Sequence, residues 1–326
     1  MNHLPIAPQA KISNQKTTSK SVDPQEFLPN SKNTLAVVIT YNPDEGLDNR
    51  IRSILNEVDK VIVLDNKSSS GFEELKKIQS INGVILIKNR DNLGVATALN
   101  QALECAYSFS KEPLRWILTF DQDTLVYPGM IEQYRKIITE NSKPNKIAII
   151  GTNYFCRSIN DTRFHFPADE NPGHEWTYIP TVITSGSLMN LDLTKLIGRF
   201  RDEFFIDHVD DEYCLRARKK GYLVLINKSA LMEHTIGAES LHKFLWRKTG
   251  TSNHSPLRRY YMMRNHLYLV QEYLGVETVW VLKTVYSRMK MMILMLLFED
   301  NRWVKLKHCL VGIQHGFKKI LGKKTT

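Results

Sequence analysis

The stretch WILTFDQDT at 116–124 decides the fold that this sequence predicts. Its mostly apolar part, 116–120, has the length and composition of a strand buried on both faces of a parallel sheet. Asp121 and Asp123 follow at once, on either side of Gln122. Residues i and i+2 at an extended strand end project to the same side, so both carboxylates can be presented to one ion.

Runs of the same kind lie on both sides of this stretch, at 35–40, 60–64, 84–87 and 147–150. Between the runs, apolar residues recur at helical spacing, first at Leu47, Ile51, Ile54 and Leu55, then at Val95, Ala98, Leu99, Ala102, Leu103 and Ala106. Repeated β-α-β units predict an α/β protein with a doubly wound, mainly parallel, Rossmann-like sheet. In such sheets ligands bind beyond the carboxyl ends of the strands.

Polar residues occupy these predicted strand ends. They are Thr40, Tyr41 and Asn42, then Asp65, then Asn92 and Gly94, and finally Asp121 and Asp123. No GxGxxG follows the first run and no GxxxxGK[ST] occurs, which counts against a dinucleotide dehydrogenase and a P-loop enzyme. The two aspartates suit Mg²⁺ or Mn²⁺, which complete their coordination with substrate phosphates and water. A polar turn is the alternative, but the position after the fourth predicted strand favours the metal site.

Composition sets the domain organisation. The 326 residues, 42% hydrophobic and 24% charged, suit one large α/β domain with an appendage. Four cysteines without CxxC spacing indicate neither a disulfide framework nor a zinc site. We predict a disordered N-terminal leader at 1–33, because this segment is rich in Ser, Lys, Asn and Gln. The catalytic domain is then expected at 34–242.

The C-terminal region, 243–326, carries 16 basic and 4 acidic side chains, hence a net +12 within a chain of net +10. Charges interrupt the apolar segment 279–298, which argues against a spanning helix and favours an interfacial or packed one. A second apolar stripe lies among lysines, at Leu306, Cys309, Leu310, Ile313, Phe317, Ile320 and Leu321. Such a basic amphipathic helix suits an anionic membrane surface. The alternative is a helix packed on the catalytic domain with a solvated basic face.

Several stretches, in this order, carry a family resemblance. They are VVITYN at 37–42, VIVLDNKSS at 61–69, DNLGVATALN at 91–100, LTFDQDT at 118–124, TSGSLMN at 184–190, FFIDHVDDEYCLRARKKGY at 204–222, MEHTIG at 232–237 and HSPLRRYYMMRN at 254–265. With them the sequence resembles family 2 glycosyltransferases of the GT-A fold, and among these the bacterial dTDP-rhamnosyltransferases. The resemblance covers nearly everything after residue 33.

The resemblance implies roles for the donor-binding residues. The residues expected to bind the nucleotide sugar are Thr40, Tyr41, Asn42, Asp65, Asn92, Gly94, Asp121 and Asp123. Among them, Asp65 is expected to form a hydrogen bond with the pyrimidine base. Capping of loops and of the following helix is the alternative for the first six. Gly186 leaves space for the donor sugar or acceptor, or else forms a tight turn. His234 joins Asp123 and Asp121 as a metal ligand, or else is structural.

The resemblance also places the catalytic base at Asp210, with Asp207 and Asp211 as rivals. Glu212 and Arg216 are expected at the acceptor or donor sugar. The alternative is that the acids 210–212 only complement the dipole of the helix that they begin. As base, Asp210 would take the proton of the acceptor hydroxyl while a cation neutralises the leaving diphosphate.

The function that the resemblance implies is inverting transfer of L-rhamnose from dTDP-L-rhamnose to a lipid-linked glycan. The resemblance places this reaction in bacterial surface polysaccharide or O-antigen (lipopolysaccharide) biosynthesis. The protein is then expected to act as a peripheral protein on the cytoplasmic, inner face of the cell membrane. No nucleic-acid partner is expected, because no known binding module accompanies the basic tail. The alternatives are transfer from a UDP-hexose or UDP-galactofuranose, and a sugar-1-phosphate nucleotidylyltransferase.

Overall fold

The computed structural model describes residues 27–109, 114–156, 160–164, 166, 171–234, 240–244 and 247–324. Its strands are β1 Thr34–Thr40, β2 Lys60–Asp65, β3 Val84–Lys88, β4 Trp116–Asp121, β5 Leu125–Val126, β6 Ile147–Cys156, β7 Asp161–Thr162, β8 Trp176–Tyr178, β9 Ser187–Asn190, β10 Leu223–Glu233, β11 Ser240–Phe244 and β12 Arg247–Thr251. Its α-helices are α2 Leu47–Leu55, α3 Phe72–Gln79, α4 Val95–Ser108, α5 Met130–Glu140, α6 Leu191–Ile197, α7 Val209–Lys219, α8 Pro256–Tyr273, α9 Thr278–Phe298 and α10 Arg302–Phe317. Short 3₁₀ turns lie at Pro144–Lys146 and Asp202–Phe204.

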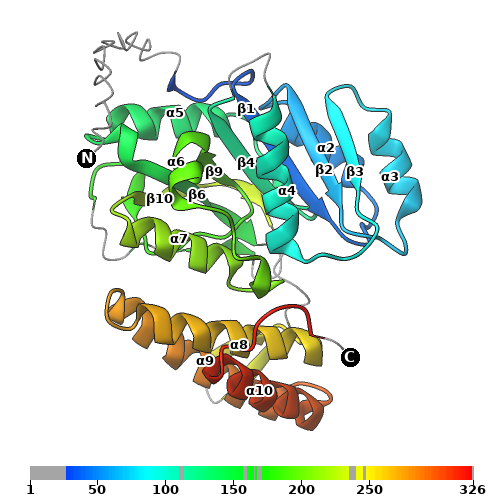
Figure 1. Cartoon of the computed structure of the whole chain (residues 1–326), viewed down its shortest axis with the longest axis vertical. Coiled ribbons are helices and arrows are strands. Elements are labelled where there is room, and N and C mark those ends of the chain that lie inside the picture. The colour runs from blue at the N-terminus through cyan, green and yellow to red at the C-terminus, as the bar shows by residue number, and fades with distance from the viewer. Residues whose placement is uncertain are drawn as a thin grey trace, which may run out of the picture.

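The main sheet has the strand order β3-β2-β1-β4-β9-β6-β10-β5 (Figure 1). The first four strands in this order are parallel, and the predicted apolar runs coincide with β1, β2, β3, β4 and the start of β6. The predicted α/β fold class is therefore confirmed. The sheet as a whole is mixed, because β9 runs antiparallel between β4 and β6, while β10 is again parallel to β6.

Helices cover both faces of this sheet and create two apolar cores. Alternate residues of β1 point to opposite faces, so Leu35 and Val37 enter one core while Ala36 and Val38 enter the other. The first core contains the apolar sides of α4 and α7, and the second those of α2, α3 and α5. The carboxyl ends of β1, β2 and β4 are thereby fixed beside one another.

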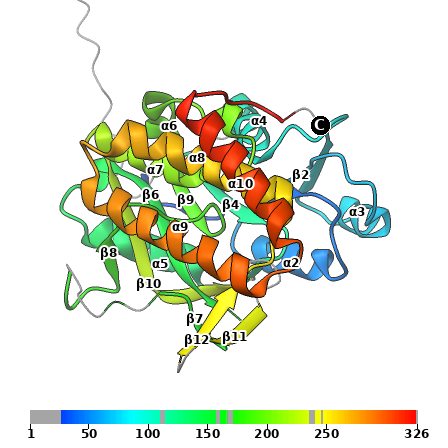
Figure 2. The ribbon, with the colours of Figure 1, turned by 90° about the horizontal axis from the view of Figure 1, so that it is seen from below.

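The three C-terminal helices form a separate layer under the domain, with α8 adjacent to α7 (Figures 1 and 2). Ion pairs join the layer to α7, for example Arg218 Nε to Glu277 Oε1 at 2.6 Å. Within the layer, Glu299 is buried between Arg259 and Lys305. A Cβ on Gly312 of α10 would lie 2.5 Å from the carbonyl oxygen of Tyr260 in α8, so glycine permits this close packing. The predicted C-terminal helical appendage is confirmed.

The apolar stripe predicted for 306–321 is divided between two environments. Cys309 is buried, and Leu306 and Ile313 pack with it against Met263 of α8 and Met295 of α9. Leu310 and Phe317 instead face solvent. No helix in the described ranges combines the length and the apolarity that crossing a bilayer requires.

Of the predicted leader, residues 1–26 lie outside the described residues, whereas 27–33 run along the catalytic domain. The ring of Phe27 lies edge-on to that of Trp116, with centroids 5.5 Å apart, and Trp116 Nε1 donates to the Phe27 carbonyl at 2.8 Å. These contacts fix the approach of the chain to β1.

Candidate active site

Three residues predicted as metal ligands meet at the end of the sheet. Asp121 ends β4, Asp123 follows it, and His234 comes directly after β10. His234 Nδ1 lies 3.2 Å from Asp123 Oδ1, and Nε2 lies 3.7 Å from Asp121 Oδ2. One ligand atom from each residue lies within 4.8 Å of the others. The structure therefore brings together side chains that are far apart in the sequence.

The chemistry of these three residues fits a divalent cation. Two carboxylates and one imidazole suit Mn²⁺, and the carboxylates suit Mg²⁺. The side chains of Asp121 and Asp123 remain 44% and 36% exposed, which leaves room for substrate oxygens. Burial lowers the pKa of His234, but the hydrogen bond that His234 donates to Asp123 and the charges of both aspartates outweigh this effect and raise the pKa. The site thus favours bound positive charge.

Asp210 lies in the first turn of α7, close enough to Asp121 for the two carboxyl groups to repel each other. Its Oδ2 accepts from Thr184 N at 3.3 Å, and its Oδ1 accepts from Asp211 N at 2.9 Å. A cavity of about 20 Å³ adjoins it, lined mainly by apolar side chains and large enough for about one water. Burial, reinforced by the charges of Asp211 and Asp121, raises the pKa of Asp210 to about 8.

The two rival carboxylates have basic partners. Asp207 is paired with Arg258, whose Nε lies 3.2 Å from Oδ1. Asp211 Oδ2 lies 2.7 Å from His208 Nδ1, and although burial opposes it, this bond and the charge of His208 lower the pKa of Asp211. In the part of the chain that the structure describes, Asp210 accepts from backbone N–H groups only. Asp210 is therefore the most basic of the three carboxyl groups and, once deprotonated, the best placed of them to take a proton.

A tight turn at 184–186 connects the candidate metal ligands with Asp210. While Thr184 N donates to Asp210, the neighbouring Ser185 Oγ accepts from Asp121 N at 3.3 Å and bonds Thr124 Oγ1. Thr124 Oγ1 in turn lies 3.3 Å from His234 Nδ1. Sequence reasoning gave no role to Thr124, Thr184 or Ser185, although they lie in the LTFDQDT and TSGSLMN stretches that carried the family resemblance.

Gly186 makes this turn possible. Its φ is +71°, and a Cβ there would lie 2.8 Å from both Met232 Sδ and Thr152 Cγ2. Protein side chains thus fill the space beside it, which supports the tight-turn alternative. Contact with a sugar stays a prediction.

The residues predicted to bind the nucleotide line the ends of β1 and β2. Asp65 is buried, with Oδ2 accepting from Ser68 N at 3.2 Å and Oδ1 accepting from Thr40 Oγ1 at 3.3 Å. Asn42 Oδ1 similarly accepts from Ser69 N at 2.7 Å. These bonds support the loop-capping alternative, while base binding by Asp65 stays a prediction.

Tyr41 differs from these capping residues, because its side chain is exposed. Its backbone N–H donates to Gln122 Oε1 at 2.8 Å, which holds Tyr41 beside the Asp121 and Asp123 carboxylates. An exposed aromatic ring at this point offers a stacking surface for a base.

Asn92 and Gly94 shape the start of α4. Asn92 Oδ1 accepts from Gly94 N at 3.0 Å and from Asn66 Nδ2 at 3.1 Å. A Cβ on Gly94 would lie 2.5 Å from the carbonyl oxygen of Phe205, which also accepts from Val95 N at 2.7 Å. The close approach at Gly94 is therefore to the segment that precedes α7, and contact with a nucleotide stays a prediction.

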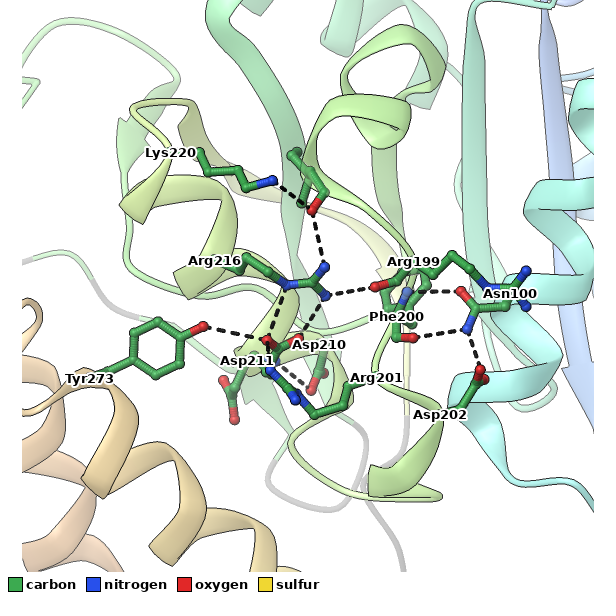
Figure 3. A network of polar contacts seen from close by, with 12 residues as sticks. Asn100, Arg199, Phe200, Arg201, Asp202, Asp210, Asp211, Arg216, Lys220 and Tyr273 are labelled. Carbon is green, nitrogen blue, oxygen red and sulfur yellow. Dashed lines mark hydrogen bonds and ion pairs between the residues drawn. The ribbon is translucent and has the colours of Figure 1, made fainter. Parts of the chain in front are cut away.

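Glu212 and Arg216 belong to an ion-pair network. Figure 3 shows its other members, with Arg216, Arg201 and Tyr273 labelled. Arg216 Nη2 donates to Glu212 Oε2 at 2.8 Å and to the Arg199 carbonyl at 2.8 Å. Arg201 and Tyr273 also donate to Glu212, whose side chain is fully buried. The network fixes α7 against the 197–201 segment, and the predicted sugar contact of Glu212 and Arg216 has no support in this geometry.

Arg258 is a further residue that sequence reasoning did not single out. It comes from the HSPLRRYYMMRN stretch, at the start of α8, and its side chain is 42% exposed. It pairs with Asp207. Burial raises the pKa of Asp121, and the nearby charge of Arg258 only partly opposes this rise. An exposed guanidinium here can bind phosphate oxygens next to the metal ligands.

The segment that leads into Asp210 has unusual backbone geometry. Phe205, Asp207 and His208 have φ values of +64°, +63° and +61°, a region that non-glycine residues rarely occupy. Asn265 of α8, itself buried, donates Nδ2 to the carbonyl oxygens of Phe204, Ile206 and Asp207 at 3.0, 2.9 and 2.9 Å. Asn265 therefore holds the backbone immediately before Asp210, the candidate base.

We expect Asn265→Ala to lower kcat by roughly 10–100-fold with little change in the KM for the donor, because the base loses its alignment. Gln271→Ala in the same helix is the matched control, since Gln271 also donates to backbone carbonyls, those of Leu267 and Gly316. Steady-state kinetics and thermal melting of both variants test this. A Tm loss in Asn265→Ala with unchanged kcat would show a structural role only.

The fold, together with the grouping of Asp121, Asp123 and His234 near Asp210, points to one class of protein, the glycosyltransferases of the GT-A type. Residues 35–195 match the family model described as glycosyl transferase family 2. The dTDP-rhamnosyl transferase RfbF of Shigella flexneri is 30% identical over 255 residues, which cover 74% of this chain and 81% of that protein. The chain belongs to glycosyltransferase family 2 and is similar to a rhamnosyltransferase within it.

A solved structure supports the fold. GalNAc-T7, crystallised with UDP, GalNAc and Mn²⁺, superposes with a TM-score of 0.52 at 11% identity and covers 73% of this chain. This chain spans about half of that protein, 48% of its length. At this identity the likeness shows the GT-A fold alone.

Proposed function

We propose that this protein is an inverting, divalent-metal-dependent rhamnosyltransferase that uses dTDP-L-rhamnose. The observation that carries the proposal is the turn at 184–186, which connects Asp210 on one side with Asp121, Thr124 and His234 on the other. The donor follows from the similarity to the Shigella enzyme. Membership of family 2 leaves the nucleotidylyltransferase alternative without support.

The proposed reaction is a single displacement. Asp210 accepts the proton of the acceptor hydroxyl, whose oxygen bonds to the anomeric carbon as the bond from that carbon to the diphosphate breaks. A cation held by Asp123, Asp121 and His234, either Mg²⁺ or Mn²⁺, would neutralise charge on the leaving diphosphate. Arg258 contributes positive charge on the same side. One displacement at the anomeric carbon inverts its configuration.

The proposed acceptor is a lipid-linked glycan in bacterial surface polysaccharide or O-antigen synthesis. The protein would then act on the cytoplasmic face of the cell membrane as a peripheral protein. Its basic C-terminal region, with a net +12 over 243–326, supports this location, because anionic lipids attract clustered lysine and arginine side chains.

Turnover across a panel of nucleotide sugars tests the donor. We expect dTDP release from dTDP-L-rhamnose to exceed nucleotide release from UDP-glucose, UDP-galactose and UDP-galactofuranose, each measured with Mn²⁺ present. Thermal shift with the same compounds gives an independent readout, since a bound donor stabilises the folded state. Preferential release of UDP would instead establish one of the UDP-sugar alternatives.

A further inference from the structure

The helix α9 exposes a continuous apolar stripe. Its members are 49–71% exposed, and they are Val279, Leu282, Tyr286, Met289, Ile293 and Leu297. Their spacing of three or four residues places them all on one side of the helix. The stripe extends over almost the whole of α9, Thr278–Phe298.

The neighbouring α10 adds exposed apolar side chains at seven-residue spacing. They are Trp303, Leu310 and Phe317, which are 71%, 55% and 63% exposed. Seen from below, α9 and α10 lie in front of the domain, and α10 crosses in front of α8 (Figure 2). An apolar surface of this extent is unusual on a protein that is free in water and marks a contact with a partner or a membrane.

The exposed charges around this surface are mainly basic. Lys283 and Lys290 are exposed and adjoin the stripe along α9, while Arg302 and Lys307 are exposed on α10. Three of the four acids in 243–326 are neutralised within the fold. Glu272 pairs with Lys219, Glu277 pairs with Arg218, and Glu299 is buried with Arg259 and Lys305. The surface is therefore complementary to an apolar partner that carries negative charge.

We propose that the outer face of α9, together with the exposed side of α10, lies in the interface of an anionic lipid bilayer. Apolar side chains with exposed Tyr286 and Trp303 among them, bordered by lysines, are the chemistry of a helix lying in the plane of a membrane. A symmetric dimer through the same face would bring lysines from both copies together, which disfavours a second copy as the occupant. The sequence had placed the basic membrane contact on the 306–321 stripe and had left 279–298 as either interfacial or packed.

The opposite face of α9 relates this surface to catalysis. Arg288 lies on that face and interacts electrostatically with Asp207 and Asp211. A helix is about 10–12 Å across with its side chains. The catalytic acids would thus lie about one helix thickness above the lipid surface, within reach of a sugar on a lipid anchor. This step rests on the proposed function, whereas the membrane surface itself does not.

Vesicle flotation tests the inference with the full chain. One sample uses vesicles of phosphatidylcholine with phosphatidylglycerol, and a second uses phosphatidylcholine alone. We expect wild-type protein to float mainly with the anionic vesicles and the triple variant Leu282→Ser, Tyr286→Ser, Ile293→Ser to bind at least about tenfold more weakly. The control Phe72→Ser, Leu196→Ser removes exposed apolar side chains from the catalytic domain and is expected to bind as wild type.

Two outcomes would overturn the inference. One is equal flotation of the triple variant and the wild type. The other is a wild-type dimer in light scattering that the triple variant abolishes, which would identify a second copy as the occupant. Release of dTDP from soluble donor is measured in parallel and is expected to be unchanged in the triple variant. Loss of flotation with retained dTDP release in the triple variant would support the membrane surface. Absence of dTDP release from wild-type protein would contradict the proposed function and leave the membrane surface untouched.

Discussion

Asp210→Asn is expected to lower kcat by roughly 10²–10⁴-fold, the usual contribution of a general base. The amide keeps the shape of the side chain and can still accept from Thr184 N, but it cannot take the acceptor proton. Donor binding should change little, because the metal ligands and the residues at the ends of β1 and β2 are untouched. Steady-state transfer kinetics and calorimetric titration with dTDP measure the two effects separately.

The rival carboxylate provides the comparison for this variant. Asp211 is bonded to His208, so Asp211→Asn is expected to disturb the start of α7 but to retain the base. Its kcat should therefore exceed that of Asp210→Asn. The reverse order of the two variants would transfer the role of base to Asp211.

The raised pKa of Asp210 gives the same variant a pH signature. The base acts as a carboxylate, so wild-type kcat/KM should increase as the pH rises toward about 8. In the unfolded chain an aspartate has a pKa of about 4. Between this pH and the pKa of Asp210 in the folded protein, the folded protein keeps the Asp210 carboxyl protonated whereas the unfolded chain has lost that proton. Asp210 therefore destabilises the fold increasingly as the pH rises through this range, and Asp210→Asn should raise the Tm more at high pH than at low pH.

Asp123→Ala is expected to abolish tight Mn²⁺ binding and to lower transfer by roughly 10³-fold, since a metal ion supplies several kcal/mol to the transition state. Asp123 provides the carboxylate nearest to His234, at 3.2 Å, and its loss leaves one carboxylate and the imidazole. Calorimetric titration with Mn²⁺ and transfer kinetics measure the two losses. Glu132→Ala, at an exposed acid of α5, is the control and should retain both properties.

The strands and helices around the site were predictable where a single segment carries its own signal. The buried strands β1, β2, β3 and β4 read as apolar runs, because a strand covered on both faces needs no polar residues. The four-residue β9 and the two-residue β5 and β7 are too short to show any periodicity. The insertion of β9, antiparallel between β4 and β6, therefore could not be read from the sequence.

Helical periodicity identified the apolar faces of the C-terminal region but not their environments. The 306–321 stripe packs through Cys309 and exposes Leu310 one residue later, because α8 and α9 cover only part of α10. The α9 segment, expected as interfacial or packed, is packed on one side, with Trp280 and Val281 buried, and exposes Leu282 on the other, while contact with a membrane stays a prediction. The neighbouring helices determine which face of a helix is covered, and the sequence of one helix does not reveal where its neighbours lie.

For the site, sequence reasoning selected candidate metal ligands and a candidate base, and the structure brings these residues close to one another. Sequence reasoning could not distinguish polar residues that bind a ligand from polar residues that bond to other parts of the protein. Glu212 bonds Arg201 and Gly94 meets Phe205, in each case across a tertiary contact. Asp65 has a partner closer in sequence, Ser68, and a loop cap of this kind uses the same residue types as a binding site.

The central claim is that this chain transfers a sugar from a nucleotide diphosphate with a cation held at Asp121, Asp123 and His234. Its most direct test is dTDP release from dTDP-L-rhamnose, in the presence of acceptor, by protein stripped of metal with EDTA and then titrated with Mn²⁺ or Mg²⁺. We predict that stripping abolishes release and that a divalent cation restores it in wild-type protein but not in Asp123→Ala. Full release from completely stripped protein would contradict the claim.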